Sequence, residues 1–188
     1  MGAAAVPERM RISVERYLKM AATGVLPHEA HVELIEGEIF NMPPVGTQHS
    51  GVTGRIVKLL VLSVGDAALL LPGPTLPLGK FSAPQPDLVL LKPREDFYSH
   101  SYPLPTDVFL LIEISASSLG FDQGVKRAVY ARAGIAEYWV IDVVGQRLFR
   151  YRNPSGDQYA EAATFMDGDV VSPLALPNTQ VPVGALFK

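Results

Sequence analysis

Three charged residues stand where the surrounding sequence predicts buried strand or helix structure. Asp87 opens a short apolar run, and Glu113 lies near the end of a β-prone run over residues 108–114. Lys126 follows on the next expected helix. If the two strands pair, both carboxylates reach one edge of the sheet and form an oxygen site suited to Mg²⁺ or Mn²⁺. A nearby ammonium stabilises charge on a phosphate, so the pattern favours metal-assisted phosphodiester hydrolysis.

The same three residues also have a purely structural interpretation. Asp87 would then cap a strand, Glu113 would pair with a cation in the core, and Lys126 would lie on a solvated helix face. Spacing alone leaves both alternatives open.

Composition limits the classes of protein to consider. The 188 residues are 48% hydrophobic, which predicts one folded domain over residues 1–188. The chain contains no cysteine, so disulfides, thiolate zinc sites, iron-sulfur clusters and cysteine nucleophiles are excluded. It also has no G-x-S-x-G elbow and no glycine-rich nucleotide loop.

Charge and hydropathy predict location and partners. The 16 Lys and Arg against 19 Asp and Glu give a net charge of −3, so a nucleic-acid partner would have to meet a local basic surface. The start of the sequence lacks a signal-peptide pattern, and its apolar runs are too short to span a bilayer. We therefore expect a cytoplasmic protein that does not bind membranes. The best candidates for the basic surface are Arg55, Lys58, Lys126, Arg127 and Arg132.

Hydrophobic periodicity and turn signals predict a mixed sheet flanked by helices, in an α/β or α+β fold. Helices are expected over residues 14–23, capped by Ser13, over 47–64, and over 123–133, capped by Asp122. The segment 31–42 favours a hairpin around Glu36 and Gly37. Further strands are expected over residues 67–71, 76–81, 87–91, 108–114, 137–142 and 146–152.

Several short motifs occur in one order along residues 12–152. They are VELIEGEIFNMPP at 32–44, His49 ahead of a helix, PQPDLVLL at 84–91, LLIEIS at 110–115, D-x-x-x-K-x-x-x-Y from Asp122, and AGIAEYWVID at 133–142. Together they resemble the Uma-two family of the PD-(D/E)XK nuclease superfamily. The resemblance implies a restriction-endonuclease-like fold, with a mixed central sheet flanked by helices, and a divalent-metal nuclease site.

The resemblance also implies roles for individual residues. Asp87 matches the aspartate of the family's proline-aspartate element, Glu113 matches its second acidic ligand, and Lys126 matches a lysine on the following helix. Glu33 and His49 match auxiliary positions, although a strand ion pair and a helix cap are structural alternatives for them. Ser115 departs from the wider superfamily, because it stands where the E-x-K motif has its lysine.

These observations lead to one leading hypothesis and two alternatives. The leading one is a Mg²⁺- or Mn²⁺-dependent DNA endonuclease that acts as a homodimer by analogy with restriction nucleases. The first alternative is a catalytically silent module that uses the same fold to bind nucleic acid or to assemble. The second is a phosphohydrolase with a small substrate.

Overall fold

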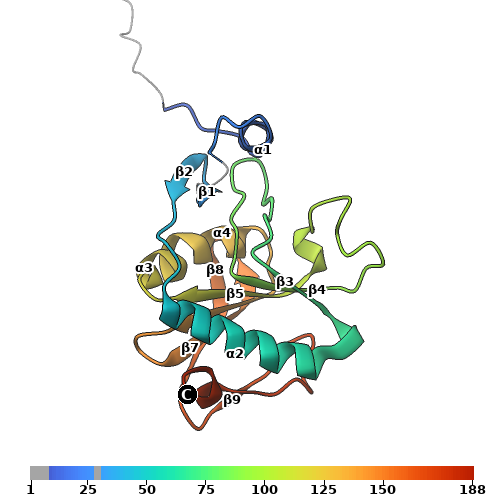
Figure 1. Ribbon diagram of the computed structural model, residues 1–188, viewed down its shortest axis with the longest axis vertical. Coiled ribbons are helices and arrows are strands. Elements are labelled where there is room, and N and C mark those ends of the chain that lie inside the picture. The colour runs from blue at the N-terminus through green and yellow to red at the C-terminus, as the bar shows by residue number, and fades with distance from the viewer. Residues whose placement is uncertain (1–8, 28–30) are drawn as a thin grey trace, which may run out of the picture.

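A six-stranded mixed sheet forms the centre of the computed structural model, which describes residues 9–27 and 31–188 (Figure 1). The strand order is β3-β4-β5-β6-β7-β8, and only the central β5–β6 pair is parallel. Parallel neighbours need a crossover connection, and here it consists of α3 (Leu119–Phe121), η3 (Asp122–Lys126) and α4 (Arg127–Arg132). The sheet contains β3 (Leu69–Pro72), β4 (Leu88–Leu91), β5 (Val108–Ser115), β6 (Glu137–Asp142), β7 (Arg147–Ser155) and β8 (Gln158–Phe165).

The remaining elements form two small hairpin sheets, β1–β2 and β9–β10, and the helices. The helical elements are α1 (Val14–Ala22), α2 (Thr47–Val64), η1 (Gly65–Ala67), η2 (Pro105–Asp107), α3 (Leu119–Phe121), the π-helical turn η3 (Asp122–Lys126), α4 (Arg127–Arg132) and η4 (Val183–Leu186). The short strands are β1 (Val32–Ile35), β2 (Glu38–Asn41), β9 (Val170–Val171) and β10 (Val181–Pro182). Within the part of the chain that is described, no helix has the length and the apolar character needed to cross a membrane.

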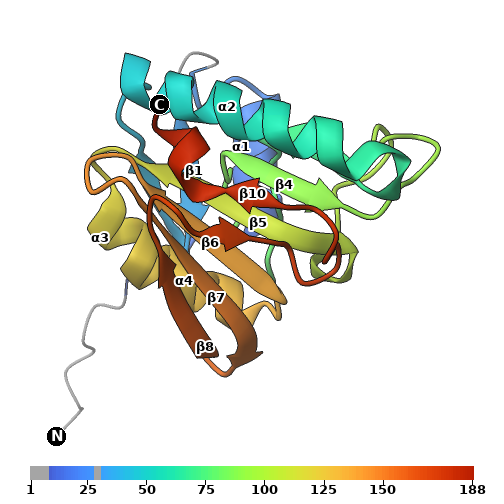
Figure 2. The ribbon, with the colours of Figure 1, turned by 90° about the horizontal axis from the view of Figure 1, so that it is seen from below.

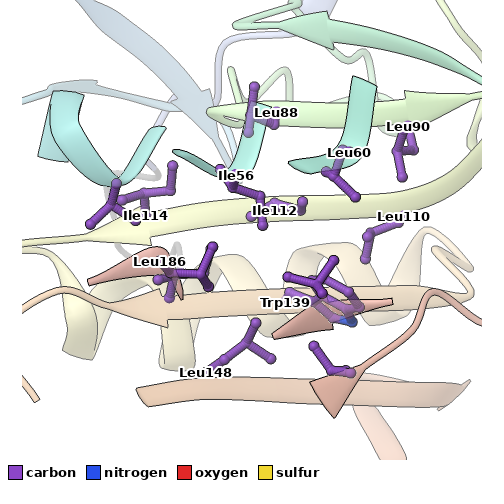
Figure 3. Close-up of a cluster of buried hydrophobic side chains, with 14 of the residues drawn as sticks. Ile56, Leu60, Leu88, Leu90, Leu110, Ile112, Ile114, Trp139, Leu148 and Leu186 are labelled. Carbon is purple, nitrogen blue, oxygen red and sulfur yellow. The ribbon is translucent and has the colours of Figure 1, made fainter. Parts of the chain in front are cut away.

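Two apolar layers cover the two faces of the sheet. Helix α2 and the C-terminal segment pack on one face, as Figure 2 shows, and α4 packs on the other. Figure 3 shows Ile56 of α2 close to Ile112 of β5, with Trp139 of β6 in the same layer. Side chains alternate along a strand, so Leu111 and Glu113 of β5 face α4 instead. The apolar pattern of β5 therefore directs one carboxylate towards the crossover helix.

The N-terminal elements form a smaller unit beside the sheet (Figure 1). Ser13 caps α1 by accepting a hydrogen bond from Arg16 N, as expected. The β1–β2 hairpin turns at Glu36 and Gly37, whose φ angles of 52° and 87° suit a two-residue hairpin turn. A bridge between Leu34 and Ala83 connects this hairpin to the segment before β4. The predicted helix and hairpin are both confirmed.

Two local predictions are wrong. Residues 76–81 are not a strand, because Leu78 N bonds to Ser82 O at 2.7 Å and folds the segment back on itself. Its leucines are buried, which explains the strand-like pattern. Asp122 is not a helix cap either: the helical segment begins at Leu119, and Asp122 lies inside it.

Candidate active site

All five predicted site residues line one cavity of about 250 Å³. The cavity is bordered by the β1–β2 hairpin, the start of α2, and the ends of β4 and β5. Its lining includes Glu33, His49, Asp87, Glu113 and Lys126. Tertiary folding thus brings together residues that lie up to 93 positions apart in the sequence.

Strand pairing places Asp87 beside Glu113. The antiparallel register pairs Leu88 with Ile112, so the residues next to them, Asp87 and Glu113, are neighbours at the strand ends. Asp87 Oδ2 accepts a hydrogen bond from Ile114 N at 2.7 Å, which fixes the carboxylate against β5. The expected meeting of these two carboxylates at one edge of the sheet therefore occurs.

Lys126 reaches these acids from the crossover helix. Its Nζ donates to Glu113 Oε1 and to Glu33 Oε1, each at 3.0 Å. Glu33 Oε2 also lies 3.0 Å from Nζ, but it accepts no hydrogen bond and is buried. The ammonium thus reaches Glu113 although position 115 is a serine. Lys126 is only 2% exposed, so its predicted place in a basic surface is wrong.

Two further residues hold Lys126 and Glu113 in place. Tyr130 donates its hydroxyl to Glu113 Oε1 at 2.6 Å, and Asp122 Oδ1 lies 3.9 Å from Lys126 Nζ. Asp122 Oδ2 accepts hydrogen bonds from Ser115 and Ser118. The sequence predicts a capping role for Asp122 and also places it first in the D-x-x-x-K-x-x-x-Y motif, where its spacing of four residues from Lys126 is a signal of their contact. A helix places residues four apart on one face.

The π-helical turn η3 supports Lys126 and Asp122. Arg127 N bonds back to Asp122 O, five residues earlier, and Tyr138 donates its hydroxyl to the same carbonyl at 3.1 Å. Both Asp122 and Lys126 are buried in this turn. Insertions of π geometry into helices are frequent at functional sites.

Burial and the neighbouring charges shift the pKa values of the residues around Lys126. Burial raises the pKa of Glu113 well above its usual value, and the pKa of Glu33 is raised for the same reason, with Lys126 acting against both shifts. Burial also disfavours the ammonium, but Glu113, Glu33 and Asp122 raise the pKa of Lys126. Lys126 therefore stays charged. Burial and the nearby carboxylates raise the pKa of Tyr130, which stays a hydrogen-bond donor.

His49 completes the cavity from the first turns of α2. Its Nε2 lies 3.0 Å from Asp87 Oδ1, and 14% of the His49 side chain is exposed against 25% for Asp87. The hydrogen bond to Asp87 raises the pKa of His49, while burial acts in the opposite direction. The pair thus favours a protonated imidazole beside the cavity.

The residues of the cavity suit a divalent cation by donor chemistry. In residues 9–27 and 31–188, no group of three or more His, Asp or Glu residues is arranged to hold a metal ion. Asp87 and Glu113 nevertheless offer hard oxygen donors on one cavity, and both hydrogen bonds to Glu113 fall on Oε1. Glu33 adds a third carboxylate to the lining of this cavity, and its Oε2 lies 3.0 Å from the Lys126 ammonium. Such oxygens are the ligands that Mg²⁺ and Mn²⁺ prefer.

Comparisons with known proteins relate the sequence and the fold of this chain to nucleases. The model of the Uma2 (Uma-two) family, described as "Putative restriction endonuclease", matches residues 14–184. A solved structure titled a "putative nuclease belonging to DUF820 from Anabaena variabilis ATCC 29413" superposes with a TM-score of 0.75. That chain is 23% identical to this one, and the match covers 94% of this chain and 97% of the other. No curated protein matches the chain. The fold is therefore restriction-endonuclease-like.

Proposed function

The chain belongs to the Uma2 family, described as "Putative restriction endonuclease", and from this we propose that it is a DNA endonuclease dependent on Mg²⁺ or Mn²⁺. Asp87 and Glu113 are the proposed metal ligands. Lys126, Glu33 and His49 are the other proposed catalytic residues. One observation carries the proposal: Lys126 Nζ lies 3.0 Å from Glu113 Oε1, on a cavity that Asp87 also lines. The helix thereby supplies the ammonium that position 115 lacks.

The reaction requires water to add to phosphorus while one ester P–O bond breaks and the leaving oxygen gains a proton. Lys126 holds a positive charge next to the cavity, where it can stabilise the phosphate oxygens as negative charge develops. Burial raises the pKa of Glu33, whose Oε2 lies 3.0 Å from the Lys126 ammonium, so this carboxylate can accept a proton from the attacking water or orient it. His49, protonated beside Asp87, can donate a proton to the leaving oxygen.

Asp87 and Glu113 would hold the cation between the strand ends. When bound, the cation supplies Lewis-acid polarisation of the phosphate and lowers the pKa of a bound water. The protein residues fix the two carboxylates: Ile114 N holds Asp87, and Tyr130 and Lys126 hold Glu113.

The direct test is cleavage of plasmid and single-stranded DNA with Mg²⁺ or Mn²⁺ by the wild-type protein. Glu113→Gln keeps the shape of the side chain and is expected to lower the rate at least roughly 10²-fold. Asp87→Asn should act in the same direction. Glu95→Gln, at an exposed acid outside the cavity, is the matched control.

Two results would contradict the proposal. The first is DNA cleavage that survives in both Glu113→Gln and Asp87→Asn. The second is a folded wild-type protein that binds DNA without cleaving it, which would support the silent binding module. Nucleotide phosphates tested in parallel would reveal a small-substrate phosphohydrolase.

The proposal extends to the organisation of the protein. We expect a single domain that acts in the cytoplasm, and a homodimer because two active sites are needed to cut both strands of a duplex. Sedimentation of the purified protein tests the dimer, and a sedimenting mass of one chain at all concentrations would contradict it.

A further inference from the structure

A second hollow, outside the active-site cavity, is lined mainly by cations. We call it the basic groove; it has a volume of about 390 Å³. Its residues are Arg9, Arg11, Ser13, Arg16, Lys80 and Phe81, none of which lines the active-site cavity. All four cations are exposed. The basic surface expected from the sequence did not include any of them.

The fold gathers these residues from two segments, 9–16 and 80–81. Val14 N at the start of α1 bonds to Lys80 O at 2.9 Å, which joins the helix to the segment before β4. The Arg11 guanidinium lies 4.1 Å from the centre of the Phe81 ring, and Lys80 Nζ lies 5.3 Å from the same centre. Arg11 Nε donates to Glu36 O at 2.8 Å. These contacts keep two cations together on one aromatic ring.

The cations of the groove have few acidic partners. Among the described residues, no carboxylate forms an ion pair with Arg11, Arg16 or Lys80, and Arg9 pairs only with Glu38, at 3.4 Å. Four arginines elsewhere form ion pairs, namely Arg94 with Asp96, Arg132 with Glu36, Arg147 with Asp142, and Arg152 with Glu137, while Arg55, Arg127 and Arg150 form none with a described carboxylate. The groove therefore differs from the rest of the surface because it brings four cations together in one hollow. In a protein of net charge −3, this concentration of four exposed cations in one hollow suits an anionic ligand.

The groove and the active-site cavity lie at the two ends of one strand. β1 carries Glu33 in the cavity, and the turn after β1 carries Glu36, whose carbonyl binds Arg11. The hairpin thus connects the two places through one hydrogen bond from the groove residue Arg11. A polyanion with regularly spaced phosphates is the ligand that can contact both places at once.

We infer that the basic groove binds the phosphodiester backbone of DNA next to the segment held in the active-site cavity. The inference rests on the proposed function. The groove makes no contact that would distinguish bases, so it contributes affinity and orientation rather than sequence preference.

The test is DNA binding without divalent cations, measured over a range of salt concentrations, for the full-length wild type and the double variant Arg16→Gln/Lys80→Gln. The association constant falls as salt rises, and each lost phosphate contact makes the slope of log K against log salt less steep by about 0.9. For the double variant we expect a slope that is less steep by about 2. We also expect binding at least about 10-fold weaker, equally for unrelated DNA sequences. Lys92→Gln/Lys188→Gln removes the same charge elsewhere and should leave the slope nearly unchanged.

The outcomes separate this inference from the proposed function. If the wild type cleaves DNA and the groove variant retains the wild-type slope, the basic groove is not a DNA contact, although the nuclease proposal stands. An equal loss in both double variants would also overturn the inference, since it would reflect net charge alone. If the wild type cleaves no DNA but the groove variant shows a less steep salt dependence of DNA binding than the wild type, the inference is supported and the nuclease proposal is overturned. If the wild type binds no DNA, the inference is overturned.

Discussion

Two glutamates on neighbouring strands are buried to a similar extent but have different surroundings. Glu113 on β5 is 3% exposed and Glu137 on β6 is fully buried. Glu137 Oε1 accepts hydrogen bonds from Trp139 Nε1 and Arg152 Nε, both at 2.8 Å, and Oε2 accepts one from Leu174 N. Both oxygens of Glu137 are therefore satisfied. Both hydrogen bonds to Glu113 fall on one oxygen, and the residue lines a cavity.

The difference shows that burial of a carboxylate does not by itself indicate a functional site. The network around Glu137 is completed by the main chain of the C-terminal segment and by an arginine, and no part of it lines the active-site cavity. Glu113 belongs to a group in which the ammonium of Lys126 faces three carboxylates, those of Glu33, Glu113 and Asp122. A closed network serves stability, whereas an open one can bind a ligand.

The largest expected effect follows the substitution Lys126→Met. It removes the cation between Glu33 and Glu113 and leaves two buried carboxylates unpaired, which costs about 3–5 kcal/mol of unfolding free energy. DNA cleavage should also fall, by roughly 10² or more. Chemical denaturation and a cleavage assay measure the two effects, with the exposed Lys58→Met on α2 as the control.

A second variant separates the two effects of Lys126. In Glu113→Gln/Lys126→Met one of the unpaired carboxylates is neutralised, so stability should partly return while cleavage stays lost. If Lys126→Met cleaved DNA at the wild-type rate, the network around Glu113 would be structural, like the network around Glu137.

Glu137→Gln should affect stability alone. It leaves Arg152, whose side chain is 15% exposed, without its carboxylate, and we expect a loss of about 3 kcal/mol in unfolding free energy. Cleavage per folded molecule should equal that of the wild type, because Glu137 lies outside the active-site cavity. Reduced cleavage at a temperature where the variant is fully folded would show that the two glutamates are not functionally distinct.

The smallest effect is expected at the half-buried pair of Arg94 and Asp96. The hydrogen bond from Arg94 lowers the pKa of Asp96 from 3.8 to about 2. A folded-state pKa below the unfolded value gives stability that is complete above about pH 4 and is lost as the pH falls through about 2. Asp96→Asn should therefore lower the Tm slightly at pH 7, and the difference from wild type should shrink below pH 3. A difference that grows in acid would contradict this pH dependence.

Much of the fold could be predicted from local patterns. Three features depend only on residues that are neighbours in the sequence. They are the helix cap at Ser13, the hairpin turn at Glu36 and Gly37, and the apolar strand that contains Glu113. Helix α2 matches its predicted bounds of residues 47–64. These features are local because backbone geometry and burial on one face leave a short-range signal.

Other features could not be predicted because they depend on distant partners. Leu76 and Leu78 have a strand-like pattern, but their segment bonds to Ser82 and Pro84 in a tight return. Asp122 has the residue type of a cap, but the hydroxyls of Ser115 and Ser118 hold it inside the helix. In both cases tertiary contacts override local preference.

Composition and local patterns are sufficient to predict the residue types of the candidate site, the strand that follows Asp87, the strand that carries Glu113, the helical segment that carries Lys126, and the absence of cysteine chemistry. The packing of distant segments is needed to show that the Lys126 ammonium reaches Glu113, that Glu33 joins it from the hairpin, and that the basic groove forms beside α1. The physical reason is range: caps and periodicity act within a few residues, while a buried ion pair needs a geometry that only the packed elements fix.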